Sequence, residues 1–111
     1  MSTQPFTPQG NTITFTANTA APTAIQANAT GALGCSNYLL QNAGNVTVFV
    51  GVGNSAVNAN TAAVIPGANS APSVPILGGA IMTLSFAPNS FFTGITSANT
   101  AVVYITPGDG S

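Results

Sequence analysis

Short runs of alternating apolar and polar residues follow one another along this chain. The run NTITFTAN places Ile13 and Phe15 on one face of an extended segment and threonines on the other. This period of two predicts a strand with one buried face. The run VTVFVGVG has four valines on one face and Thr47, Phe49 and Gly51 on the other, and its density of β-branched residues favours a packed strand. Its glycines indicate a bulge, a bend or a close approach of another backbone segment.

Similar runs predict further strands over residues 38–41, 81–86 and 101–106, and a short edge strand at residues 74–77, where a proline is tolerated. We expect turns in SFFTGITSAN and in the terminal TPGDGS, because glycine, asparagine, serine and proline favour them. NSAVNANTAA is ambiguous, since alanine favours helix and asparagine favours turns. We predict a loop with short extended pieces there.

About seven or eight short strands at a spacing of roughly 8 to 12 residues, without a convincing amphipathic helix, predict an all-β fold. The expected architecture is an antiparallel β-sandwich that is jelly-roll-like. The opening MSTQPFTPQG has two prolines and a glycine, and predicts an extended N-terminal arm over residues 1–10. Residues 11–111 are expected to form a single β-sandwich domain, close to the commonest domain size of about 100 to 150 residues.

The charge content of the chain excludes most chemistry. Asp109 is the one Asp, Glu, Lys, Arg or His among 111 residues, whereas an ordinary domain has about 25% charged residues. A Ser/His/Asp triad, a pair of catalytic carboxylates and a zinc site are therefore impossible. Cys35 is solitary, cannot form an intramolecular disulfide, and is interpreted as a small apolar residue at the start of a strand. We expect no enzyme, no catalytic residue, no cofactor and no metal.

The same composition restricts the partners. Nucleic-acid binding draws on Lys and Arg at phosphates, and both are absent. The longest apolar runs have about five residues, against roughly 20 for a membrane-spanning helix. We therefore expect neither nucleic acid nor a membrane as a partner, and we expect the chain to bind its partner through an uncharged surface of complementary shape. The large apolar residues of the arm and the main strands are the candidate interface: Phe6, Phe15, Phe49, Val50, Met82, Phe91 and Phe92.

Three segments, LLQNAGNVTVFVGVG, VPILGGAIMTLSF and GITSANTAVVYITPGDG, carry a resemblance. Together they cover about residues 36 to 110, and they resemble the capsid decoration proteins, also called cement or staple proteins, of short-tailed bacteriophages. The segment PILGG departs from the adjacent proline and glycine of that family. The resemblance implies a jelly-roll-like virion structural protein that binds the outside of an assembled capsid and stabilises contacts between major capsid subunits. It also implies the major capsid protein as partner, a homodimer, and assembly in the host cytoplasm.

Two other functions stay open at this level. A receptor-binding or fibre-associated β-sandwich module would need exposed aromatic residues for sugar stacking, and the chain has two tyrosines and no tryptophan. An ice-binding or surface-active protein is the other alternative, because TITFTANT places threonines at alternate positions on one face.

Overall fold

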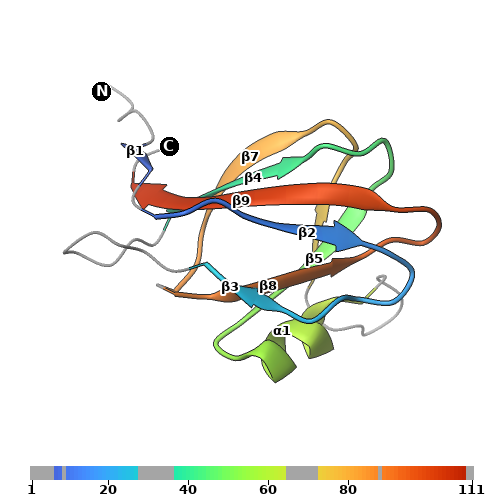
Figure 1. The fold of residues 1–111 in the computed structure, drawn as a ribbon, viewed down its shortest axis with the longest axis horizontal. Coiled ribbons are helices and arrows are strands. Elements are labelled where there is room, and N and C mark those ends of the chain that lie inside the picture. Colours follow the sequence, from blue (N-terminus) through green and yellow to red (C-terminus); the bar gives the residue numbers. More distant parts are fainter. Residues whose placement is uncertain (1–6, 9, 28–36, 65–72, 88, 110–111) are drawn as a thin grey trace.

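A computed structural model describes residues 7–8, 10–27, 37–64, 73–87 and 89–109, which form two packed sheets and one helix (Figure 1). The five-stranded sheet consists of β1 (Thr7–Pro8), β2 (Ile13–Ala17), β9 (Ala101–Asp109), β4 (Asn37–Asn42) and β7 (Ile81–Ser85). The four-stranded sheet consists of β3 (Ile25–Gln26), β8 (Phe91–Ile95), β5 (Val48–Gly53) and β6 (Val74–Ile76). The helix α1 (Ala56–Ala62) follows β5.

The strand order is that of a jelly roll. One sheet has the order β1-β9-β4-β7, with β2 beside β1 on the same side of β9, and the other has the order β3-β8-β5-β6. With the short β1 set aside, the strands from β2 to β9 form the sheets 1-8-3-6 and 2-7-4-5 in chain order, and every strand pair is antiparallel. This double Greek-key arrangement defines the jelly roll. The predicted all-β sandwich is confirmed.

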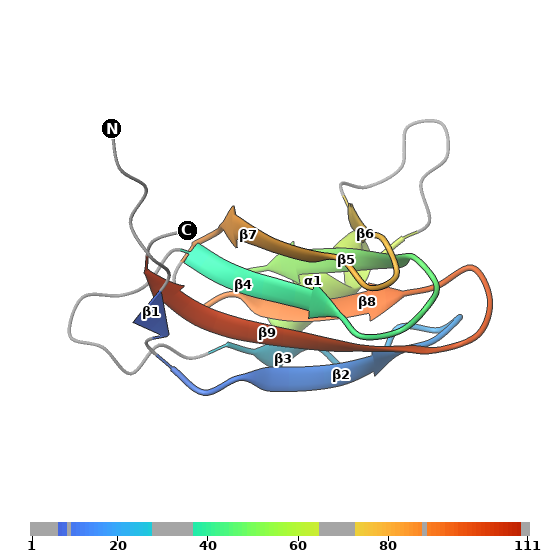
Figure 2. The same ribbon diagram turned by 90° about the horizontal axis from the view of Figure 1, so that it is seen from above.

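The core lies between the two sheets and is built by the predicted alternation. In β4, Tyr38 and Leu40 are fully buried, and Leu40 lies opposite the equally buried Ile105 of β9. From the other sheet, β5 contributes Val48 and Val50. Figure 2 views the five-stranded sheet from its outer side, with the four-stranded sheet and α1 behind it. The edge strand predicted around residues 74–77 is also confirmed, because β6 contains Pro75 and lies at the edge of its sheet.

The turn predicted in SFFTGITSAN is wrong over residues 91–95, which form the interior strand β8. The alternation of apolar and polar residues is hard to see in this strand, because a glycine faces the core and a polar residue is buried on the outer face. Gly94 faces the core, where an added Cβ would lie 2.7 Å from Cγ1 of Val48, and the polar Thr93 is buried on the opposite face. The Thr93 hydroxyl donates to the carbonyl of Pro22 at 2.7 Å, which satisfies its hydrogen bonding away from water.

The loop predicted over residues 54–63 is also wrong, because α1 forms there. Its N-cap, Ser55, accepts a hydrogen bond from the backbone N–H of Asn58 at 3.2 Å, which satisfies an otherwise unpaired donor at the helix start. The helix packs onto Gly51 and Gly53, where an added Cβ would overlap the backbone of Ala59. The predicted close approach of a backbone at these glycines is therefore confirmed, and helix packing overrides the turn preference of asparagine.

The terminal turn predicted in TPGDGS is wrong as far as Asp109, because β9 continues to that residue. Ala43 N–H donates to the carbonyl of Val102 at 2.8 Å, so these two residues form a hydrogen-bonded pair that continues the ladder between β4 and β9. Because hydrogen-bonded and non-hydrogen-bonded pairs alternate along antiparallel strands, Tyr38 and Pro107 form a pair without hydrogen bonds. The missing N–H of Pro107 consequently costs no hydrogen bond to β4. On the other side of β9, the predicted arm contributes β1, in which Thr7 lies opposite Asp109.

Candidate binding surface

The described residues contain no group of three His, Cys, Asp or Glu side chains that could hold a metal ion. Within the same ranges, no helix is long and apolar enough to cross a membrane.

The two outer faces of the sandwich differ. On the four-stranded sheet, α1 lies over β5 and β8 (Figures 1 and 2), and its backbone at Ala59 packs closely on Gly51. On the five-stranded sheet, the outward side chains have no helix over them among the described elements. We call this surface the open face. It consists of Thr14, Thr16, Leu39, Gln41, Ile81, Thr83, Val102, Tyr104 and Thr106.

The register arranges the open face in rows across the strands. Thr14, Tyr104, Gln41 and Ile81 lie opposite one another in β2, β9, β4 and β7. Tyr104 is 40% exposed and Ile81 is 59% exposed. Because directly opposed side chains on one face lie about 4.5 to 5.5 Å apart, this row is a continuous surface four strands wide.

Hydroxyl and amide groups order one end of the open face. The hydroxyls of Thr12 and Thr106 share a hydrogen bond of 2.7 Å between β9 and the residue before β2. At the adjoining corner, the Ser85 hydroxyl donates to Oδ1 of Asn37 at 2.7 Å. Every residue of the open face is uncharged, so a partner there would be held by apolar contact and neutral hydrogen bonds, with little screening by salt.

Three of the seven candidate interface residues are not surface residues, which corrects the sequence interpretation. Phe15 is 5% exposed, and Val50 and Phe92 are fully buried. All three point into the space between the sheets, because they share faces with the other core residues of β2, β5 and β8. A partner cannot reach them while the sandwich is folded.

The other candidate residues lie in different places. Phe49 and Phe91 are half-buried on the outer face of the four-stranded sheet. Met82 is half-buried and packs against the core from β7. Phe6 lies outside the described residues, as do Cys35 and the rest of the arm apart from residues 7–8 and 10. The structure therefore does not gather these candidates into one patch.

Sequence reasoning overlooked most of the open face, including its two exposed apolar residues, Tyr104 and Ile81. The alternation did assign Tyr104 and Ile81 to one face of their strands. It did not indicate which strands are neighbours, nor which sheet the helix covers. The sequence of a single strand therefore could not show that these residues belong to one shared surface.

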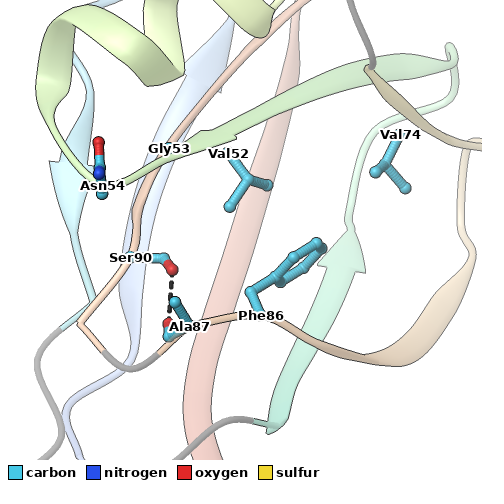
Figure 3. A pocket seen from close by; sticks show the side chains of 7 residues that line it. All are labelled: Val52, Gly53, Asn54, Val74, Phe86, Ala87 and Ser90. Carbon is cyan, nitrogen blue, oxygen red and sulfur yellow. Dashed lines mark hydrogen bonds between the residues drawn. The ribbon is translucent and has the colours of Figure 1, made fainter.

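A pocket of about 330 Å³ lies where β5 ends and the chain turns from β7 into β8 (Figure 3). Val52, Val74 and Phe86 supply its apolar side, and Asn54, Gly53, Ala87 and Ser90 complete the lining. The Ser90 hydroxyl donates to the Ala87 carbonyl at 2.5 Å. The Tyr38 hydroxyl donates to the same carbonyl at 2.7 Å. The polar groups beside the pocket are thus largely engaged within the protein, and the remaining lining suits a small neutral apolar group.

Fold and surface together define a jelly-roll sandwich with a single charged side chain, one helix-covered face and one uncharged open face. Comparison with known proteins adds no relative, because no family model, curated protein or solved structure matches the chain.

Proposed function

We propose that this chain is a virion structural protein that binds the outside of an assembled phage capsid and stabilises contacts between major capsid subunits. The observation that carries the proposal is the open face, an uncharged surface four strands wide with Tyr104 and Ile81 exposed in one row. The motif resemblance to capsid decoration proteins supports the same proposal, as does the jelly-roll strand order, which is common among capsid domains.

The physical chemistry of the open face suits a partner presented in many fixed copies. Neutral surfaces provide little long-range attraction, so association depends on shape and on apolar burial. A standard interface buries about 800 Å² on each partner, and the open face would supply part of that area. In this role the chain needs no catalytic group, and its lack of charge minimises repulsion between neighbouring copies on the shell.

The test compares charge placed on the open face with the same charge placed elsewhere. Gln41→Lys and Tyr104→Lys alter strands in the middle of the open face. Val57→Lys is the matched control, because Val57 is 74% exposed on the helix that covers the other sheet. Each protein is mixed with capsids stripped of their decoration protein, and the bound fraction is measured by co-sedimentation.

We expect the wild type and Val57→Lys to bind, and both open-face variants to lose at least about tenfold in affinity, which corresponds to about 1.4 kcal/mol. Binding of the wild type should also survive molar salt, because charge pairs do not hold the complex. Equal binding by all four proteins would contradict the role of the open face. Release of the wild type at modest ionic strength would contradict neutral recognition.

A further inference from the structure

The outer edge of β7 is an edge of the five-stranded sheet, where main-chain N–H and C=O groups point away from β4. β7 pairs with β4, and among the described residues it has no second neighbour. Asn42 N–H donates to the carbonyl of Ala80 at 3.0 Å in the same register. Because hydrogen-bonded pairs alternate along an antiparallel ladder, Met82 and Leu84 direct their main-chain groups toward β4. Ile81, Thr83 and Ser85 direct theirs outward.

This edge lacks the features that usually prevent pairing with another chain. Edge strands are commonly protected by charge, proline, bulges or very short length. In the other sheet, β6 contains Pro75 and β3 has two residues. β7 has five residues, IMTLS, without charge or proline, and its register with β4 runs without a bulge.

The opposite edge of the same sheet, formed by β2, has less to gain from an added strand. Its inward residues Phe15 and Ala17 are already buried, at 5% and 0% exposure. The inward residues of β7, Met82 and Leu84, are half-buried and pack against the rim of the core. An added strand beside β7 would therefore bury apolar surface that an added strand beside β2 would not.

We infer that two copies of the chain pair through their β7 edges, antiparallel about a two-fold axis at Thr83. The sequence IMTLS is complementary to itself in that register. Thr83 lies opposite Thr83 of the second copy, and Ile81 lies opposite Ser85, so all outward main-chain groups from 81 to 85 find partners. On the inner side, Met82 meets Leu84 of the second copy. Threonine pairs and apolar pairs across strands are favourable, and a two-fold axis makes the interface self-complementary.

The test introduces single charges at the axis. In Thr83→Lys, two lysines would face each other across the interface, and in Thr83→Glu two glutamates would do so. Like charges directly opposite each other destabilise strand pairing. Thr14→Lys and Thr14→Glu are matched controls, because Thr14 is an outward-facing threonine of the five-residue β2 at the other edge of this sheet. Light scattering after size exclusion gives the oligomeric state, and far-UV circular dichroism checks the fold.

We expect a wild-type dimer in concentrated solution and a dimer dissociation constant at least about tenfold higher in each Thr83 variant. An equimolar mixture of Thr83→Lys and Thr83→Glu should recover the dimer, and added salt should weaken this mixed dimer. Both Thr14 variants should dimerise as the wild type does. A monomeric wild type, unchanged dimers of the Thr83 variants, or a mixture that stays monomeric would each overturn the proposal. The isolated protein is used throughout, so the outcome is independent of capsid binding.

Discussion

Asn42 joins the two sheets through a set of buried hydrogen bonds. Its side chain is fully buried at the end of β4. The amide nitrogen donates to the carbonyl of Val46 at 2.8 Å and to the carbonyl of Ile76, in the other sheet, at 2.9 Å. The amide oxygen accepts from the N–H of Gly44 at 2.9 Å. A single side chain thus satisfies three backbone groups, one of which belongs to the opposite layer of the sandwich.

Replacing Asn42 with alanine removes all three hydrogen bonds. A hydrogen bond contributes about 1 kcal/mol net, and a buried group left unpaired costs about 1 to 3 kcal/mol. We therefore expect Asn42→Ala to lower the free energy of unfolding by at least about 3 kcal/mol, which is a large part of the roughly 5 to 15 kcal/mol that is typical of a domain.

Asn42→Asp separates hydrogen-bond chemistry from shape. The carboxyl has the size of the amide and keeps an acceptor for Gly44, but an oxygen then faces the carbonyls of Val46 and Ile76. Burial and those carbonyls favour the protonated acid, which raises the pKa of the introduced carboxyl in the folded state. A raised folded-state pKa means that stability is greatest at low pH and is lost as the pH rises through that pKa. Asn42→Asp should therefore be more destabilised near pH 7 than near pH 4, relative to the wild type at the same pH.

Urea unfolding followed by far-UV circular dichroism measures these free energies at several pH values. Between about pH 5 and 8 the wild type provides a flat background, because the chain has no histidine and no side chain whose ordinary pKa lies in that range; near pH 4 each variant is compared with the wild type at the same pH. If Asn42→Ala lost less than about 1 kcal/mol, the three hydrogen bonds would not have the assigned role. If Asn42→Asp showed the same destabilisation at both pH values, the argument from buried carbonyls would be refuted.

Three further substitutions test the helix and the pocket. Gly51→Ala should lower the free energy of unfolding by about 1 to 3 kcal/mol, because the new Cβ overlaps the backbone of Ala59; thermal unfolding near the wild-type midpoint would contradict the close packing. Ser55→Ala should cost about 1 kcal/mol through loss of the N-cap, with faster hydrogen exchange confined to α1 as the diagnostic reading. Tyr38→Phe should cost about 1 kcal/mol, because its hydroxyl donates to Ala87 from a fully buried ring. A urea midpoint unchanged from that of the wild type would show that this bond adds nothing.

Much of the fold could be predicted from the sequence because most strands have one buried and one outward face. Alternation located the strands β2, β4, β5, β7 and β9, and in β2 and β5 it grouped on one face the residues that the structure places in or against the core. It failed at β8 and α1, where the deciding contacts are tertiary. Gly94 occupies a core position in which a side chain would collide with Val48, and the α1 backbone lies on Gly51 and Gly53. Neither contact leaves a periodic signal in its own segment.

The candidate surface was less predictable than the fold. Phe15, Phe92 and Val50 are large and apolar, so composition favoured them as interface residues, but the same property places them in the core. The open face emerges only when register is known, since Thr14, Gln41 and Ile81 belong to strands far apart in the chain and meet through β9 and β4. The type of a residue indicates whether it can make apolar contacts, whereas the order and register of the strands decide which residues lie together on a surface.

The two proposals can be distinguished because capsid binding depends on the side chains across the whole open face, whereas dimer pairing depends on the main-chain edge of β7 alone. Pairing at β7 continues the sheet from one copy into the next, so both open faces would point to the same side and form a surface of double width. Two linked binding faces bind an array of subunits more tightly than one, since the second contact becomes intramolecular. Thr83 belongs to the open face as well as to the proposed axis, so Thr83→Lys should weaken capsid binding by both routes, and an equimolar mixture with Thr83→Glu should recover the part that depends on the dimer. Gln41→Lys should lose capsid binding while remaining dimeric. If the mixture of Thr83→Lys and Thr83→Glu were dimeric yet bound capsids no better than Thr83→Lys alone, the dimer would not contribute to capsid binding.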